Sequence, residues 1–134
     1  MNYWLLKSDP ETYSYGDLEK DGKAVWDGVA NNLALQYIRQ MKKGDLAFIY
    51  HSGEDKHIIG IAEITSNPYP DPKLKDGKLV VMDLKPIKTL AHPVTLAAIK
   101  ADASFADFSL VRMSRLSVMP VSKERWDKIM EMGK

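Results

Sequence analysis

A change of hydrophobic period near the middle of the chain constrains the fold more than any other feature. Residues 46–52 (LAFIYHS) and 57–66 (HIIGIAEITS) follow the period of two that is typical of β-strands. A short polar turn, residues 53–56, separates them. So short a connection joins antiparallel strands, because a parallel pair needs a long crossover, usually a helix. The pattern therefore predicts an antiparallel hairpin and excludes an all-parallel fold.

The flanking segments predict further strands and several helices. We expect strands over 2–7 and 78–90, and helices from Ser14 to about Lys20, from Asn31 to Met41, after Thr95 and after Ser122. The proline-rich segment 67–72 (NPYPDP) is expected to be a surface excursion outside the sheet. We find no linker or repeat. The sequence therefore predicts one α+β domain over residues 1–134, whose sheet curls into a barrel.

Tryptophans and helical spacing indicate part of the core. In the last predicted helix, Trp126, Ile129 and Met130 are spaced i, i+3, i+4 and should face the interior. Trp4, in the first predicted strand, is also expected in the core.

Composition limits the classes of function. The chain has 19 Lys and Arg against 18 Asp and Glu, so its net charge is +1 and it lacks the basic excess of proteins that bind nucleic acid mainly through phosphates. It has no Cys, which excludes disulfides and Cys-ligated zinc. Neither a signal peptide nor a membrane span is apparent. We expect a soluble, cytoplasmic protein with no membrane partner.

Motifs for catalysis are missing from the sequence. The three histidines lack metal-ligand spacing, and there is no glycine-rich phosphate-binding loop and no GxSxG motif. Asp27 and Asp83 could form a carboxylate pair, but such residues more often cap turns or face solvent. We therefore expect no enzymatic activity, no cofactor and no metal.

Three segments combine aromatic, small and hydrogen-bonding residues in a way that packing alone does not require. They are residues 4–10 (WLLKSDP), 25–31 (VWDGVAN) and 110–120 (LVRMSRLSVMP). With 50–52 (YHS), 60–63 (GIAE), 69–72 (YPDP) and 122–129, they resemble the landmarks of the EVE domain family, which is related to the PUA and YTH modules. The similarity runs from about Tyr3 to Met132, in the family's order and spacing.

The resemblance implies an α+β fold of the PUA-like class, a mixed β-barrel or pseudo-barrel with flanking helices. It also implies a cleft that binds a modified nucleobase in DNA or RNA. A base outside its stack offers a π face and a hydrogen-bonding edge, and an added methyl group gains from an apolar wall. The residues that the resemblance places at this site are Lys7, Ser8, Trp26, Asp27, Gly28, Val29, Asn31, His51, Ser52, Arg112, Ser114, Arg115, Leu116 and Ser117.

Several candidates also have a purely structural interpretation. Trp26 is either a core anchor or a stacking surface for a base. Asp27 either caps the following turn or accepts a hydrogen bond from a base edge. Asn31 is either the N-cap of the next helix or a ligand-binding residue. His51 and Ser52 either close the hairpin or line the cleft.

The cationic candidates have alternatives of the same kind. Lys7 is either a solvated charge or a phosphate contact. Arg112 and Arg115 either pair with surface acids or bind phosphate or a base, for which the planar guanidinium is suited. Ser114 and Ser117 are either turn residues or ligands.

One stretch departs from the family pattern. Ala30, Asn32 and Leu35 stand where Arg, Tyr and Arg are usual, although Asn31 is retained. Without those two cations and the aromatic ring, polynucleotide binding should be weaker and less dependent on salt. A sensor for a free modified nucleoside or similar metabolite is therefore the second hypothesis, and an enzyme acting on nucleic acid is a more distant third.

Overall fold

Seven strands and six short helices make up the part of the chain that the computed structural model describes, residues 1–73 and 77–134. The strands are β1 (Tyr3–Ser8), β2 (Ala24–Trp26), β3 (Leu46–His51), β4 (His57–Ile64), β5 (Tyr69–Pro70), β6 (Val80–Thr95) and β7 (Val118–Val121). The helices are α1 (Tyr15–Asp21), α2 (Asn32–Gln40), α3 (Leu96–Lys100), the 3-10 helix η1 (Ala103–Phe105), α4 (Ser109–Arg112) and α5 (Lys123–Met132).

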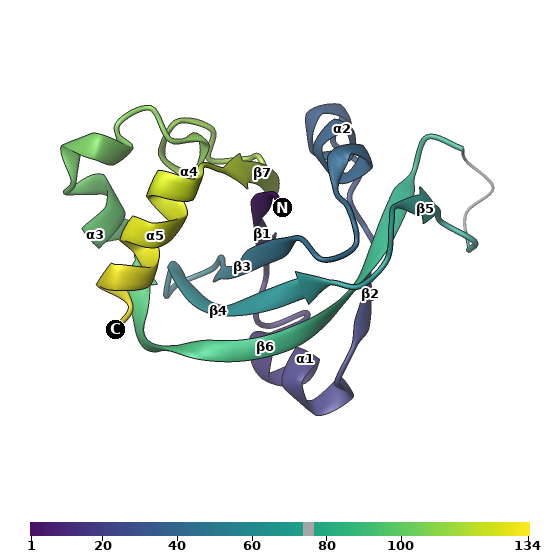
Figure 1. The fold of residues 1–134 in the computed structure, drawn as a ribbon, viewed down its shortest axis with the longest axis horizontal. Coiled ribbons are helices and arrows are strands. Elements are labelled where there is room, and N and C mark those ends of the chain that lie inside the picture. Colours follow the sequence, from purple (N-terminus) through teal and green to yellow (C-terminus); the bar gives the residue numbers. More distant parts are fainter. Residues whose placement is uncertain (74–76) are drawn as a thin grey trace.

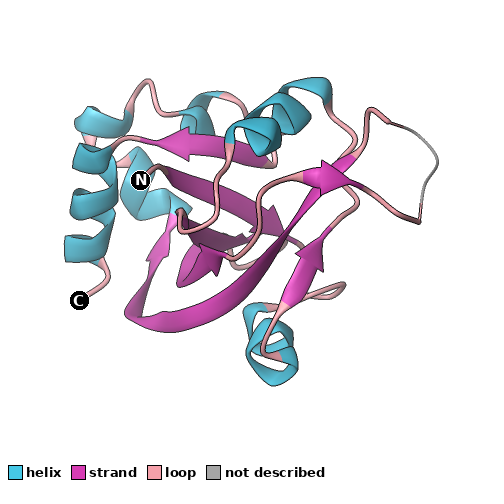
Figure 2. Ribbon diagram, turned by 45° about the vertical axis from the view of Figure 1, so that its right-hand side comes forward, coloured by secondary structure: helices cyan, strands magenta, loops and turns pink. Residues whose placement is uncertain are grey.

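One curled, mixed sheet forms the centre of the molecule. Its strand order is β2-β6-β4-β3-β1-β7, and β5 pairs with β6 beside this path. The β1–β3 pair is parallel, and the other pairs are antiparallel. Figures 1 and 2 show the long β6 sweeping across the sheet from β5 to the region of α5, with α1 below the sheet. The α+β pseudo-barrel expected from the sequence is confirmed.

Irregular pairing explains why the sheet curls. The register shifts between Ile49 and Tyr50 in the β3–β4 pair, and twice more along the β4–β6 pair. Each such irregularity bends a strand and increases its twist. β6 consequently pairs with β2 near its start and with the beginning of β4 near its end.

Aromatic side chains fill the space between the sheet and α5. The ring of Trp126 stacks on Phe48 with centroids 3.8 Å apart, and its other neighbour is Tyr3, at 4.6 Å. Trp126 and Ile129 are buried and Met130 is half-buried, as their spacing predicts. The packing therefore ties the C-terminal helix to β1 and β3.

A buried carboxylate ties the chain start to the turn before β3. Asp45 is 3% exposed and accepts hydrogen bonds from the Trp4 indole N–H at 3.0 Å and from the backbone N–H groups of Asn2 and Lys42. Three donors offset the cost of removing this carboxylate from water. Trp4 is 3% exposed, which confirms its expected place in the core.

Local sequence signals are confirmed at most element boundaries. The hairpin formed by β3 and β4 is present, and the side chains of Ser14, Asn31, Thr95 and Ser122 accept hydrogen bonds as N-caps of their helices. The helices are short, and none in the described part of the chain is long and apolar enough to cross a bilayer.

Two expectations about the strands need correction. Within the segment 67–72, Tyr69 and Pro70 form β5 and pair with β6, so the segment is not wholly outside the sheet. A proline is tolerated there because β5 is an edge strand. The Tyr69 hydroxyl also holds β5 against β6 by donating a 2.5 Å hydrogen bond to Asp83. The strand expected to end at residue 90 continues to Thr95, since its pairing with β4 resumes there.

Replacing Gly60 with alanine should destabilise the fold. A methyl group at this position would lie 2.6 Å from the ring of Tyr15, which is 1% exposed and held by a 2.7 Å hydrogen bond from its hydroxyl to the Ile61 carbonyl. Because the ring cannot move away freely, we expect Gly60→Ala to lower the free energy of unfolding by about 1–3 kcal/mol in urea denaturation.

Gly16→Ala is the matched control for this experiment. A methyl group at Gly16, in the first turn of α1, would meet only the Ser14 hydroxyl at an ordinary 3.5 Å. This variant should be as stable as the wild type or slightly more stable. Equal stability of the two variants would contradict the packing of Tyr15 against Gly60.

Candidate functional site

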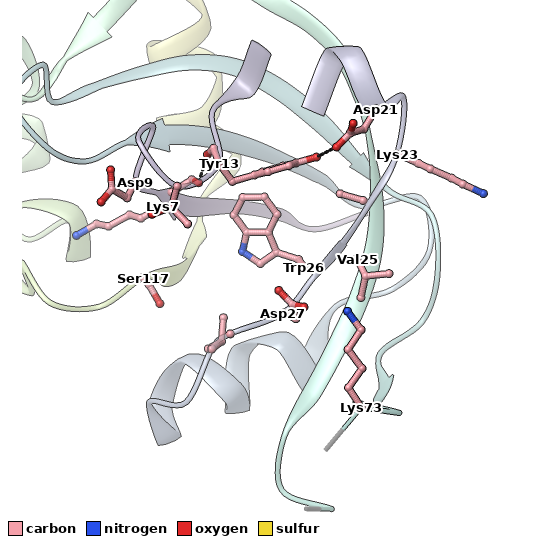
Figure 3. A pocket seen from close by; sticks show the side chains of 15 residues that line it. Lys7, Asp9, Tyr13, Asp21, Lys23, Val25, Trp26, Asp27, Lys73 and Ser117 are labelled. Carbon is pink, nitrogen blue, oxygen red and sulfur yellow. Dashed lines mark hydrogen bonds between the residues drawn. The ribbon is translucent and has the colours of Figure 1, made fainter. Parts of the chain in front are cut away.

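A cavity of about 740 Å³ lies where the end of β1 meets β2 and the loops that flank α1. Figure 3 shows the Trp26 indole at its centre, with side chains from four separate parts of the chain around it. Its lining consists of Lys7, Ser8, Asp9, Thr12, Tyr13, Asp21, Lys23, Ala24, Val25, Trp26, Asp27, Gly28, Val29, Lys73 and Ser117. The cavity therefore joins residues that are distant in the sequence.

Trp26 belongs both to the core and to the cavity wall. It is 9% exposed and packs in the main hydrophobic cluster, yet it lines the cavity. Tyr13 meets it edge-on, with ring centroids 6.5 Å apart and planes at 76°. This arrangement fixes the orientation of the indole, because edge-to-face contact is a favoured aromatic geometry. The two interpretations of Trp26, a core anchor and a stacking surface for a base, are therefore compatible.

Tyr13 is itself anchored, at the far side of the cavity. Its hydroxyl donates a 2.9 Å hydrogen bond to Asp21 (dashed in Figure 3). Burial, this hydrogen bond and the nearby negative charge raise the pKa of Tyr13 to about 12, so the phenol stays protonated at neutral pH. Sequence reasoning missed this residue, because its link to Trp26 depends on the tertiary path of the chain around α1.

Lys7 connects the cavity to the loop before β7. Its ammonium donates a 2.9 Å hydrogen bond to the Ser114 carbonyl and lies 5.7 Å from the Tyr50 ring centroid. Burial, and to a smaller degree the positive charge of Lys56, lower the pKa of Lys7. Next to it, Ser8 donates to the Tyr13 carbonyl, which holds the loop before α1 against β1.

The chain turns sharply after Trp26. Gly28 has φ 78°, a left-handed conformation that other residues rarely adopt, and a methyl group added here would meet no atom within 4 Å, so the backbone angle and not crowding favours glycine. Asp27 is exposed at the cavity mouth and forms no side-chain hydrogen bond with any residue in the described ranges. Its carboxylate is thus available to accept a hydrogen bond from a ligand. The expected capping of the turn by Asp27 is not found among these residues, and the left-handed conformation of Gly28 makes the turn.

Among the described residues of the lining, positive and negative charges are equal in number. In Figure 3, Lys7 and Asp9 extend to one side of the indole, and Lys23 and Lys73 lie on the other side. The charged residues of the lining are Lys7, Lys23, Lys73, Asp9, Asp21 and Asp27. The cavity therefore presents hydrogen-bond donors and acceptors without a strong field of one sign.

His51 and Ser52 lie behind the cavity wall rather than in it. The Nε2 atom of His51 accepts a 2.9 Å hydrogen bond from the backbone N–H of Tyr15, and its ring is 5.5 Å from that of His57. Burial, followed by repulsion from His57, lowers the pKa of His51. The Ser52 backbone N–H donates to the carbonyl of Ser8 at 2.9 Å. Both residues fix the strand end that carries part of the lining.

The other candidates are spread over different environments. Asn31 caps α2 by accepting from the backbone N–H of Ala34, and Leu116 is 4% exposed in the core. Arg112 and Arg115 are exposed and form no ion pair with any residue that the structure describes, so the surface-pair alternative is not found.

Half of the predicted site residues are thus brought together by the fold. Those that line the cavity are Lys7, Ser8, Trp26, Asp27, Gly28, Val29 and Ser117. Ser114 contributes its carbonyl to Lys7. The lining residues absent from the prediction come chiefly from the loops around α1 and from Lys73. A binding role for the whole set stays a prediction.

The positions that depart from the family pattern also lie outside the lining. Ala30 and Asn32 are exposed, whereas Leu35 is 2% exposed. In this chain, position 35 therefore serves the core of the protein. No group of three or more His, Cys, Asp or Glu residues suited to a metal ion occurs in the described ranges.

Comparison with known proteins identifies the family. The EVE domain family model matches residues 2–132. The chain belongs to the EVE domain family. Thymocyte nuclear protein 1 of Mus musculus is 31% identical to it, in an alignment that covers 98% of this chain and 73% of the mouse protein.

Solved structures of relatives have the same fold over nearly the whole chain. The structure of Rpa0253 from Rhodopseudomonas palustris is 46% identical, with a TM-score of 0.94, and the match covers 99% of this chain and 93% of that one. Human THYN1 in complex with DNA containing 5-methylcytosine is 26% identical, with a TM-score of 0.92 and coverage of 100% and 98%.

The lowered pKa of His51 predicts that acid destabilises the fold at this site. Below its ordinary value of 6.5, the unfolded chain takes up a proton that the folded chain resists, because burial and then repulsion from His57 oppose a positive charge there. A protonated Nε2 also could not accept the Tyr15 hydrogen bond. The stabilising contribution is complete above pH 6.5 and is lost as the pH falls toward the lowered folded value. Urea denaturation between about pH 8 and pH 5 measures the loss.

Glutamine at position 51 separates this effect from other titrations. Its carbonyl can accept the same N–H but does not titrate. We expect His51→Gln to lose less stability across this pH range than the wild type, and His92→Gln, at an exposed position, to lose as much as the wild type. If His51→Gln loses as much stability across this pH range as the wild type, another group is responsible for the pH dependence.

Proposed function

We propose that this protein binds a modified nucleobase in DNA, in the cavity walled by Trp26, and that it catalyses no reaction on the base. The observation that carries the proposal is the Trp26 indole, which lines a cavity of about 740 Å³ and is held edge-on by Tyr13. A volume of this size lies within the range of small-molecule sites.

The lining offers the contacts that a flipped base requires. A base stacked on an aromatic ring gains roughly 1–3 kcal/mol. The carboxylate of Asp27 is available to accept from the amino group of a base, and Thr12 and Ser117 add hydroxyl groups. The half-buried Val29 supplies apolar surface beside the indole, where a methyl substituent would be favoured.

The relatives support DNA and a methylated pyrimidine as the first ligand to test. The human relative THYN1 was solved in complex with DNA containing 5-methylcytosine. Its fold matches this chain with a TM-score of 0.92. We therefore take 5-methylcytosine in DNA as the reference ligand for the experiments below.

Titration of labelled oligonucleotides with Trp26 variants tests the proposal. The wild type should prefer DNA with 5-methylcytosine to the same DNA without it. Trp26→Leu removes the stacking surface but keeps an apolar side chain, so it should weaken binding by about 5- to 150-fold. Trp26→Phe should lose less, because it retains a ring.

Stability measurements keep this test interpretable. Because Trp26 also packs in the core, both variants are expected to be less stable, and thermal unfolding must show that each is folded at the binding temperature. Equal affinity of Trp26→Leu and the wild type would exclude the indole as the base platform. A change in DNA mass after incubation, seen by mass spectrometry, would contradict binding without catalysis.

The balance of charges around the cavity favours a second candidate, a receptor for a free modified nucleoside. The described lining holds three lysines and three aspartates, so these residues together attract phosphate weakly. In a thermal-shift series, 5-methyl-2′-deoxycytidine would raise the melting temperature of such a receptor. An oligonucleotide that contains the same nucleoside would raise it no more than the free nucleoside does. Stabilisation by the oligonucleotide at far lower concentration would favour the DNA-binding proposal.

A further inference from the structure

A second cavity, of about 600 Å³, lies between the β3–β4 turn and the start of α3. The turn and α3 lie on the same side of the molecule (left in Figure 1). Lys56, His57 and Lys100 line the cavity. Neither lysine forms an ion pair with a residue in the described part of the chain. The proposed base site makes no use of these groups.

The strand pairing places this cavity close to the first one. Ser8, which lines the first cavity, pairs with His51 on β3, and His51 pairs with His57 on β4. His57 lines the second cavity. Adjacent strands are about 4.8 Å apart, so the two walls are on the order of 10 Å apart. That length corresponds to about three base-pair steps along the axis of a B-form duplex, at 3.4 Å per step.

One lysine of each cavity lies within electrostatic range of the other. Lys7 lines the first cavity, and Lys56 is close enough that its charge contributes, after burial, to the lowered pKa of Lys7. Glu54 and Asp55 also line the second cavity and oppose an anion there. The two lysines must therefore outweigh these carboxylates for a phosphate to bind.

We propose that the second cavity, through Lys56 and Lys100, binds the phosphodiester backbone of the strand whose modified base occupies the first cavity. This inference rests on the proposed function and adds a path for the flanking nucleotides. It places the salt-dependent part of DNA affinity at two lysines outside the base pocket, although the described lining of each cavity holds as many carboxylates as lysines.

A pair of matched double variants tests the path. Lys56→Gln with Lys100→Gln removes two positive charges at the second cavity. Lys123→Gln with Lys134→Gln removes two positive charges, one from the start of α5 and one from the residue that follows its Gly133 cap, and both lysines are ion-paired and exposed. Affinities for a duplex with one 5-methylcytosine are measured at several salt concentrations, and 5-methyl-2′-deoxycytidine serves as the ligand without phosphate.

The Lys56/Lys100 double variant should bind the duplex more weakly than the wild type. Its plot of log affinity against log salt should also be less steep by about 1.8, which is 0.9 for each of two lost phosphate contacts. Its affinity for the nucleoside should be unchanged. The Lys123/Lys134 variant should retain the wild-type slope. Conversely, Glu54→Gln with Asp55→Asn should bind the duplex more tightly than the wild type.

The possible outcomes distinguish a failure of this inference from a failure of the proposed base binding. If the wild type binds the methylated duplex but both lysine double variants have the same slope, the backbone path is wrong and the base site stands. If the wild type binds neither the duplex nor the nucleoside, both proposals fail. Weaker nucleoside binding in the Lys56/Lys100 variant would show that it disturbs the base site, and would also overturn the separate path.

Discussion

The parallel pairing of β1 with β3 is the interaction on which the candidate site depends. Six residue pairs, from Tyr3 with Leu46 to Ser8 with His51, place the first strand inside the sheet between β3 and β7. The end of β1 is therefore held on both sides, and Lys7 reaches the Ser114 carbonyl of the loop before β7. Because the backbone is fixed in this way, the lining residues at the end of β1 have defined positions before any ligand arrives, which lowers the entropic cost of binding.

Local features could be predicted from the sequence because short-range physics determines them. The hairpin follows from alternation on either side of a short turn, and the cap of Asn31 on α2 follows from its side chain and the helix after it. The cavity wall depends on other contacts. Tyr13 and Lys73 approach Trp26 only because the loop before α1 and the segment after β5 fold over the same face, and no local pattern encodes that approach. The family resemblance located Trp26 and Asp27 but not these partners.

Trp26 illustrates how one residue serves both stability and binding. Its buried part belongs to the hydrophobic core, and the part that lines the cavity is oriented by Tyr13, which Asp21 holds in turn. A ring that is already fixed loses little freedom when a base stacks on it. The same coupling explains why a sequence-based choice between core anchor and stacking surface has no single answer at this position.

The distribution of charge gives the proposed functions a common physical basis. A chain with a net charge of +1 cannot rely on long-range attraction to DNA, and the lining of the base pocket is itself balanced. Recognition in such a pocket rests on stacking, shape and hydrogen bonds, which salt affects little. Cations outside it, such as Arg112 and Arg115, which form no ion pair with a described residue and flank the Ser114 carbonyl bound by Lys7, can then add phosphate contacts without altering which base is chosen. Base selectivity and strand affinity thus reside in different groups of residues, so each can change without the other.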